Sequence, residues 1–367
     1  MTVKIEDQSV AVESRLDAWL AVLHELGGSD ILLIDGSKPL LRVEGVLKPL
    51  VEAEPLTGEE IEAIARTQID DQYGERLHLG QEVEFSFTWR KEARIRASAF
   101  YSRNACSLSL RRIPLRIPTL DDLGLPPTVG RLLSGRHGLI LVTGQAGSGK
   151  STSMAAMVEE INRTEACHIV TIEDPIEFVH SNAMAAVNQR EIGTDTRTFA
   201  TALRAVRRED PDVVMVSEIR DRDSISALLD LAESGHRVIG AVAVNDSVSC
   251  IERLIDVFPA SERDQIRVQL AGTLLAVLYQ RMIPRRDRGV APAYELMVGL
   301  PSVRRLIREG RTSRLREAMA SGAAAGMQTL ESSLSGLVER GLIDLDAAVD
   351  TSLYPQDLAA PVMAPTA

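Results

Sequence analysis

The sequence predicts a two-domain α/β protein in which a smaller α+β unit precedes a parallel sheet with crossover helices. In the second part of the chain, strand-like apolar runs alternate with helical stretches, which is typical of a parallel sheet. In the first third, short runs that alternate apolar and polar residues surround two helical patterns, which is typical of an α+β unit. At 367 residues the chain is long enough for two cores.

The first third contains two expected helices and five strand-like runs. Helical spacing predicts a helix over residues 14–26, stopped by GGSD. Thr57 and Glu60 form a capping box that starts a second helix through Ile61, Ile64 and Ala65. The inward positions of the first helix are Leu16, Trp19, Leu20, Leu23 and Leu26. The strand-like runs are ILLID, LLRVEGVLKPL, VEFSFTW, RIRASAFY and CSLSLRRI.

A proline-rich stretch, IPLRIPTLDDLGLPP, breaks both periodicities and predicts a linker. We therefore expect an N-terminal α+β domain over residues 1–112, a linker over 113–126 and a second domain over 127–352. Residues 353–367, rich in proline and alanine, are expected to form a disordered tail.

The second part contains three expected strands, 138–144, 168–174 and 212–218, with a helix over 151–162 after the first. Near the end, PSVRRLIREG, GMQTLESSLSGLVERG and LDAAVD predict helices, with Gly310, Gly326 and Gly341 at their boundaries. In the first of these, Val303, Leu306 and Ile307 face inward and the arginines face outward.

Composition excludes several classes of protein. The formal charge of −11 and the pI near 5.2 argue against a nucleic-acid binder that acts by bulk charge. The isolated cysteines Cys106, Cys167 and Cys250 suggest neither a disulfide framework nor a cysteine zinc site, and a reducing cytoplasm is the simplest compartment. No run approaches the 18 apolar residues of a membrane span, so we expect membrane contact only through partners.

A phosphate-binding pattern, LVTGQAGSGKST, stands between the strand 138–144 and the helix 151–162. Glycines let the backbone amides face phosphate oxygens, Lys150 reaches the β and γ phosphates, and Ser151 is suited to bind Mg²⁺. The expected nucleotide-binding residues are Gly144, Gln145, Ala146, Gly147, Ser148, Gly149, Lys150, Ser151 and Thr152.

Acidic residues end the next two strands. Glu173, Asp174 and Glu177 follow the second strand, and Glu218 ends the third. Carboxylates at this edge of a parallel sheet can orient a water for attack on the γ phosphate or hold Mg²⁺ through its water ligands.

The order of motifs along most of the chain resembles that of the secretion-superfamily ATPases, ring-forming motors of type II secretion and type IV pili. The C-terminal segment is similar to that of the type IV pilus retraction branch, which drives twitching motility. We therefore expect a member without the additional N-terminal domain and the four-cysteine zinc insert of assembly and secretion members. The motifs are VTIEDPIEFVH (170–180), NQREIG (188–193), LRAVRREDPDVVMVSEIRD (203–221), ESGHRVIG (233–240) and RLIDVFP (253–259).

The resemblance implies a RecA-like P-loop ATPase domain behind a PAS-like N-terminal domain, acting as a homo-hexamer that hydrolyses ATP with Mg²⁺. Gly144 to Thr152 would form the Walker A loop. Glu173 would be the key acidic-box carboxylate, holding Mg²⁺ through water beside Ser151, and Glu218 would be the general base. The family arginines would be Arg204, Arg208 and Arg220, with Arg94 and Arg96 as N-terminal candidates, and His236 would belong to the histidine box.

The same resemblance implies a location at the cytoplasmic face of the inner membrane and contact with a pilus platform protein, with a paralogous ATPase as a further possible partner. The chain departs from the family pattern at Leu32, Gln145 with Ala146, Ser217 and Ala243, which replaces the second histidine of the box. Alternatives are a weakly active accessory subunit of a retraction ring, an assembly ATPase without the zinc insert, and a small-molecule kinase.

Overall fold

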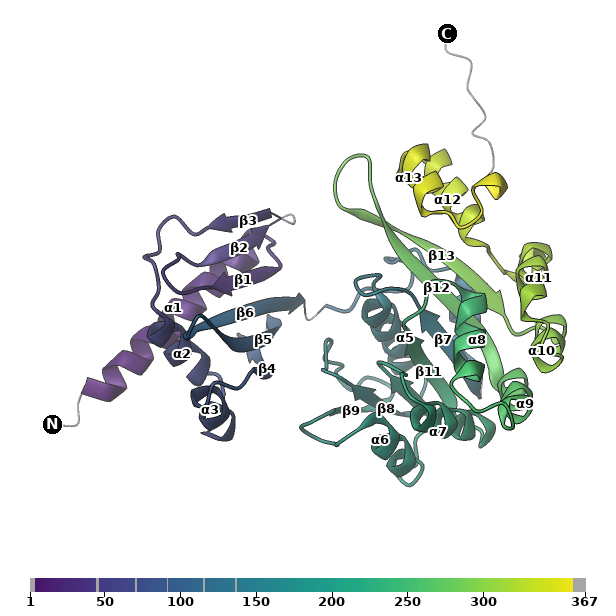
Figure 1. The fold of residues 1–367 in the computed structure, drawn as a ribbon, viewed down its shortest axis with the longest axis horizontal. Helices are drawn as coiled ribbons and strands as arrows, with labels where there is room; N and C mark the ends of the chain where they lie inside the picture. Colours follow the sequence, from purple (N-terminus) through teal and green to yellow (C-terminus); the bar gives the residue numbers. More distant parts are fainter. Residues whose placement is uncertain are drawn as a thin grey trace, which may run out of the picture. The chain divides into compact units, whose positions relative to one another are not determined.

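The computed structural model describes residues 4–43, 46–69, 71–90, 92–114, 116–135 and 137–358. The chain forms two compact units (Figure 1). The first comprises residues 1–116 with 177–179, and the second comprises 117–176 with 180–367, so that the division after residue 116 falls within the proline-rich stretch.

The first unit is an antiparallel sheet with three helices. Its strand order is β3-β2-β1-β6-β5-β4. The strands are β1 (Asp30–Leu33), β2 (Leu40–Val43), β3 (Val46–Pro49), β4 (Val83–Trp89), β5 (Ala93–Ser102) and β6 (Ala105–Pro114). The helices are α1 (Lys4–Glu25), α2 (Gly58–Arg66) and α3 (Asp71–His78).

Helix α1 shows where the sequence prediction was right and where it was wrong. Leu16, Trp19, Leu20 and Leu23 are buried as expected, and they form part of one core with the inward side chains of the sheet. Leu26 is 55% exposed because α1 ends at Glu25, so this position lies beyond the helix. The capping box of Thr57 and Glu60 is confirmed at the start of α2.

Two further features of the first unit differ from the expectation. The run LLRVEGVLKPL is not one strand but the antiparallel pair β2 and β3, in which Val43 is opposite Val46. Helix α3 was not predicted, because DQYGERLH has few apolar residues from which to detect a helical period.

The second unit is built on a seven-stranded sheet of order β13-β12-β7-β11-β10-β8-β9. The expected parallel arrangement is confirmed: every neighbouring pair is parallel except the last hairpin, β12 with β13. Its strands are β7 (Gly138–Thr143), β8 (His168–Glu173), β9 (Ala186–Glu191), β10 (Val213–Val216), β11 (Arg237–Val242), β12 (Leu274–Pro284) and β13 (Val290–Val298).

Helices cover both faces of this sheet. The connection from β7 to β8 moves toward β9, whereas those from β9 to β10, β10 to β11 and β11 to β12 move the opposite way. Because such crossovers are right-handed, α5 lies on one face and the other crossover helices lie on the opposite face. The helices up to β12 are α4 (Pro127–Leu133), α5 (Lys150–Thr164), α6 (Phe199–Val206), α7 (Arg222–Glu233), α8 (Ser247–Asp256) and α9 (Arg263–Thr273).

Four strands of this sheet were not predicted from the pattern. Strand β9, AVNQRE, is a mostly polar edge strand, and β11 was noticed only as a family motif. The apolar run 270–278 belongs to the end of α9 and the start of β12. No helix among the described residues is long and apolar enough to cross a membrane.

The C-terminal region is helical as expected. It contains α10 (Pro301–Arg308), η1 (Thr312–Arg314), α11 (Leu315–Ser321), η2 (Ala323–Ala325), α12 (Leu330–Glu339), α13 (Leu345–Thr351) and η3 (Pro355–Asp357). Val303, Leu306 and Ile307 are buried as predicted. One outward arginine was predicted wrongly: the Arg304 guanidinium donates to the carbonyls of Gly299, Gly272 and Leu274, because it caps backbone groups at the start of β12.

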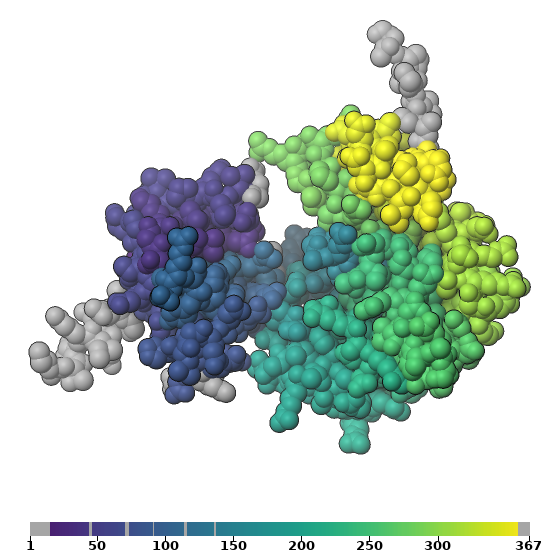
Figure 2. Space-filling model, viewed as in Figure 1, coloured from purple at the N-terminus to yellow at the C-terminus, as the bar shows by residue number. Residues whose placement is uncertain are grey.

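The disordered tail was predicted to begin at residue 353, but ordered structure continues beyond this residue. Arg316 places its guanidinium 3.6 Å from the ring centroid of Tyr354 and pairs with Asp357 on η3, so residues 354–357 pack on α11 and α12. Figure 2 shows this yellow C-terminal segment as one group at the surface of the second unit. Residues 359–367 lie outside the described residues.

Candidate functional site

The phosphate loop joins β7 to α5 at the edge where the parallel strands end, which we call the carboxyl edge. Gly144, Gly147 and Gly149 have φ of +149°, +77° and +87°, which other residues rarely adopt. A Cβ on Gly144 would lie 2.4 Å from Ser148 Oγ and 2.5 Å from the carbonyl oxygen of Gln280. The loop is therefore a tight curl that only glycine permits at this position.

Strand β12 supports the loop through a side-chain contact. The buried Gln280 side chain donates through Nε2 to the carbonyl oxygen of Ser148 at 2.6 Å. Two buried oxygens close by, Gln280 Oε1 and Ser148 Oγ, have no hydrogen-bond partner among the residues that the structure describes. Sequence reasoning missed Gln280, because it lies 132 residues beyond the loop and belongs to no recognisable motif.

Lys150 lies inside the curl, where its Nζ donates to the carbonyl oxygens of Gly144 at 2.8 Å and Gln145 at 2.9 Å. Gly149 is the N-cap of α5 and provides no side-chain cap. An uncapped helix start behind a glycine curl matches what a phosphate group requires of a protein. Gln145, Ala146 and Gly147 form the exposed crest of the loop.

Glu173 ends β8 and is buried, with 5% of its surface exposed. Its Oε1 accepts from Thr171 Oγ1 at 2.6 Å and from Gln189 Nε2 at 2.9 Å. The strand β8 is three strands from β7, so Glu173 lies about 14 Å sideways from the strand that leads into the loop.

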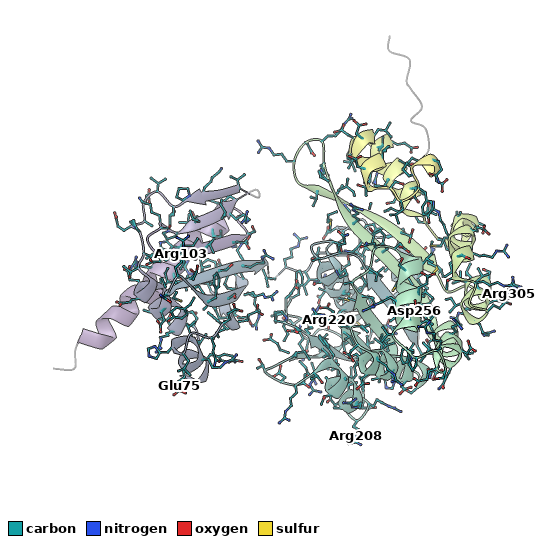
Figure 3. The ribbon with its side chains drawn as sticks, in the orientation of Figure 1. Glu75, Arg103, Arg208, Arg220, Asp256 and Arg305 are labelled. Atoms are coloured by element: carbon teal, nitrogen blue, oxygen red, sulfur yellow. The ribbon has the colours of Figure 1, made fainter. Side chains whose placement is uncertain are left out.

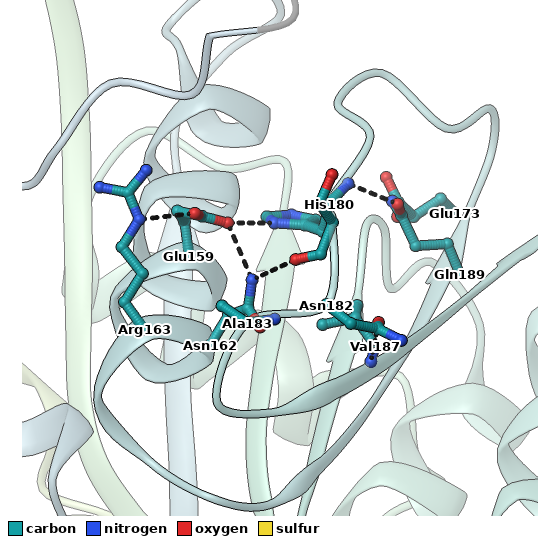
Figure 4. A network of polar contacts seen from close by, with 10 residues as sticks. Glu159, Asn162, Arg163, Glu173, His180, Asn182, Ala183, Val187 and Gln189 are labelled. Atoms are coloured by element: carbon teal, nitrogen blue, oxygen red, sulfur yellow. Dashed lines mark hydrogen bonds and ion pairs between the residues drawn. The ribbon is translucent and has the colours of Figure 1, made fainter.

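A network of polar contacts connects Glu173 with α5 (Figure 4). Gln189 Oε1 accepts from the main-chain N–H of His180 at 2.8 Å, and His180 Nδ1 lies 3.0 Å from Glu159 Oε2 on α5. Burial lowers the pKa of His180, although its contact with Glu159 opposes this shift. Burial opposes ionisation of Glu159 as well, but hydrogen bonds from His180, Asn162 and Arg163 outweigh it, and the pKa of Glu159 is lowered.

Glu218 follows β10, two strands from β7 and thus about 10 Å sideways from it. Its Oε2 pairs with the Arg220 guanidinium, and the two side chains are 28% and 71% exposed. The same hydrogen bond to Glu218 raises the pKa of Arg220. The departure at Ser217 has a structural function, since its hydroxyl accepts the main-chain N–H of Asp174 at 3.1 Å and so connects the ends of β8 and β10.

His236 was predicted as a catalytic residue, and the structure places it elsewhere. It directly precedes β11, whose first residue, Arg237, is opposite Gly138 at the start of β7. We call this opposite side of the sheet the amino edge. A strand of six residues separates the two edges by about 20 Å, so His236 lies far from the phosphate loop of its own chain. Ala243 follows the other end of β11, beside the loop.

Arg204 and Arg208 are also away from the loop. They lie exposed at the end of α6 and just after it, in the connection that leads into the start of β10 at the amino edge. Figure 3 shows Arg208 at the surface, apart from Arg220. Of the three expected arginines in the second unit, Arg220 lies at the carboxyl edge, whereas Arg204 and Arg208 do not. In the first unit, Arg94 donates to Ser86 Oγ and Arg96 pairs with Glu84 at 3.4 Å.

Within the described ranges, no group of three or more His, Cys, Asp or Glu side chains is arranged to hold a metal ion. The residues present fit a nucleotide: the curl at Gly144, the Lys150 ammonium and the uncapped start of α5 bring N–H and ammonium donors together in one loop. A P-loop on a RecA-like parallel sheet, with two carboxylates ending neighbouring strands, defines the class of P-loop ATPases.

Comparison with known proteins identifies the family. The model of the type II/IV secretion system proteins matches residues 6–339. The chain is 38% identical to the type IV pilus retraction ATPase PilT of Pseudomonas aeruginosa, over 92% of this chain and 98% of PilT. It is 34% identical to the type IV pilus ATPase PilU of the same organism, over 92% and 89% of the two chains.

A solved structure supports the same conclusion. The crystal structure of the pilus retraction motor PilT with bound ADP matches with a TM-score of 0.87 and 38% identity, over 93% of this chain and 98% of that one. The chain belongs to the family of type II/IV secretion system proteins. The predicted fold, a RecA-like ATPase domain behind a smaller N-terminal domain, is confirmed.

Proposed function

We propose that this chain hydrolyses ATP to ADP and phosphate with Mg²⁺ and drives the retraction of a type IV pilus. The observation that carries the proposal is the phosphate loop with Glu218 and Glu173 at one sheet edge, in a chain that matches the PilT retraction motor almost from end to end. The ADP in that PilT structure supports nucleotide use at this loop.

Each residue at the carboxyl edge has a proposed task. Residues 144–152 bind the phosphates, with Lys150 on the β and γ phosphates and the Ser151 hydroxyl toward Mg²⁺. Mg²⁺ supplies charge neutralisation of the phosphates. Glu173 orients a water ligand of the ion, and Glu218 accepts the proton of the attacking water. Glu218 becomes available for this step when Arg220 releases it.

The relatives support a proposal for the assembly. We infer a homo-hexamer at the cytoplasmic face of the inner membrane, which acts on a pilus platform protein and contacts the membrane only through partners. Because Arg204 and Arg208 are exposed far from their own loop, the proposal assigns them to the nucleotide of a neighbouring subunit. A paralogous retraction ATPase is a further candidate partner, given the similarity to PilU.

Steady-state ATP hydrolysis of the purified chain tests the catalytic proposal. Glu218→Gln removes the proton acceptor and keeps the shape, so the turnover number should fall by about 10²-fold or more. Glu262→Gln is a matched control, because Glu262 also pairs with an exposed arginine, Arg222, and lies outside the loop. Wild-type turnover no higher than that of Glu218→Gln would overturn the proposal.

One observation favours a second candidate, a weakly active accessory subunit. Ala243 stands at the carboxyl edge where the family carries a histidine, so this edge lacks one polar group that could contact the γ phosphate. Tight nucleotide binding with negligible hydrolysis, and stimulation of a paralogous ATPase on mixing, would identify such a subunit.

The direction of action is tested in cells. Deletion of the gene for a retraction motor should leave abundant surface pili and abolish twitching. Loss of pili on deletion would instead indicate an assembly ATPase. Appearance of a phosphorylated small-molecule acceptor would indicate a kinase.

A further inference from the structure

Glu173 is a buried carboxylate, and its placement depends on the groups that donate to it. A buried ionised group is stable only where hydrogen bonds replace its water. Thr171 lies on the same strand and face, two residues before Glu173, and its donation at 2.6 Å follows from strand geometry. Gln189 comes from another strand, β9, and therefore fixes the carboxylate relative to the rest of the sheet.

The orientation of the Gln189 amide is determined by its surroundings. Its oxygen accepts the His180 N–H, so the NH₂ end must face Glu173 Oε1. The segment that carries this N–H is attached to α5: Asn162 Nδ2 donates to the Ser181 carbonyl at 2.8 Å, and the Ala183 N–H donates to Asn162 Oδ1 at 3.1 Å.

The His180 side chain provides a further contact between this segment and α5. Its side chain is 1% exposed, and Nδ1 meets the Glu159 carboxylate, which can only accept, so Nδ1 carries the proton. Glu159 also accepts from Asn162 and Arg163 on its own helix. Since α5 begins at Lys150, a continuous set of hydrogen bonds runs from the helix of the phosphate loop to Glu173 (Figure 4).

We propose that Gln189 is a positioning residue: it keeps the Glu173 carboxylate at a fixed position relative to α5 and hence relative to the phosphate loop. The proposal rests on the proposed role of Glu173 and assigns to Gln189 no contact with nucleotide. An amide is suited to this position because it accepts from the main chain and donates to a carboxylate at once, which neither Glu nor a hydroxyl of shorter reach does.

A double-mutant cycle distinguishes positioning from general support of the fold. Gln189→Met keeps the length and removes the hydrogen bonds to His180 and Glu173, so the turnover number should fall about tenfold. In the Glu173→Gln background, the same substitution should cause less than a twofold further loss, because the group that it positions is already gone. Gln269→Met is the matched control, since Gln269 donates to Glu233 on the α7 and α9 surface.

A second measurement needs no turnover. Titration with a fluorescent ATP analogue, with and without Mg²⁺, measures how much Mg²⁺ increases the affinity for the nucleotide. Gln189→Met should reduce this increase severalfold when Glu173 is present. In the Glu173→Gln background, Gln189→Met should not reduce it further. Equal losses in both backgrounds, in either measurement, would overturn the positioning role. Absence of wild-type turnover would overturn the proposed ATPase function, and the binding cycle would then decide on Gln189 alone.

Discussion

The two edges of the seven-stranded sheet differ in the contacts of their buried charged side chains. At the amino edge, Arg237 is 6% exposed in its side chain and binds both oxygens of Glu165 at 3.0 and 2.9 Å. At the carboxyl edge, the donors to Glu173 Oε1 are the neutral groups of Thr171 and Gln189, and Lys150 donates to neutral carbonyls.

The difference separates structural charges from functional ones. A charge that binds an opposite charge inside the protein is already compensated, as at Arg237. A charged side chain that lies at the edge of the phosphate loop is placed to act on a bound ligand. The histidine that was predicted as catalytic, His236, directly precedes Arg237 at the amino edge, so within one chain it lies apart from the phosphate loop.

Removal of the loop lysine should produce the largest difference between the edges. In Lys150→Ala, nucleotide affinity should fall by about 10²- to 10³-fold, because two charge-assisted bonds to phosphate are worth about 3–4 kcal/mol together. The melting temperature should change little, since the half-buried Lys150 donates to carbonyl oxygens of the loop. Titration with a fluorescent ADP analogue measures the effect, and unchanged affinity would show that the curl is not the phosphate site.

Removal of the buried Arg237 should lower the stability of the fold and leave the nucleotide affinity unchanged. Arg237→Leu leaves Glu165, which is 30% exposed, without its partner, so unfolding free energy should fall by about 2–3 kcal/mol, somewhat less than for a fully buried pair. The melting temperature should then drop by roughly 5–10 °C at unchanged nucleotide affinity. Arg222→Leu breaks the exposed pair with Glu262 and is the matched control, with an expected loss below about 1 kcal/mol. A large affinity loss in Arg237→Leu would remove the distinction between the edges.

The sequence predicted this distinction only in part, for physical reasons. The loop, Glu173 and Glu218 were found because a glycine curl and strand-end carboxylates occur within a few residues of recognisable strands. Gln280 was not found, because its contact with Ser148 depends on the pairing of β12 with β7, which no local pattern shows. The distance of His236 from the loop of its own chain was not predicted, because a motif does not say at which end of a strand a residue lies. Ser217 was noticed as a departure, but its bond to Asp174 depends on the pairing of β8 with β10.

Addition of a histidine at the carboxyl edge should have a smaller effect on function than the removal of Lys150. Ala243 is exposed, so a histidine fits there without displacing the core. Ala243→His should raise the turnover number about tenfold, at the low end of what a positioned proton-handling group supplies. ATP hydrolysis across a range of Mg-ATP concentrations measures the change, with His236→Ala in parallel as the equivalent change at the other edge. If Ala243→His leaves turnover unchanged, the missing histidine does not limit this chain.

The smallest effect is expected for His236 itself. Its Nδ1 lies 3.0 Å from the carbonyl oxygen of Leu231 and 3.0 Å from Ser234 Oγ, so the ring supports the end of α7. His236→Ala should lower the unfolding free energy by about 0.5–1.5 kcal/mol, the value of one hydrogen bond. The turnover number and KM should change less than twofold, because about 20 Å of strand separates the ring from the loop of its own chain. A tenfold loss of turnover in a normally folded and assembled variant would show that His236 serves the nucleotide of a neighbouring subunit, and the contrast between the edges would then hold only within one chain.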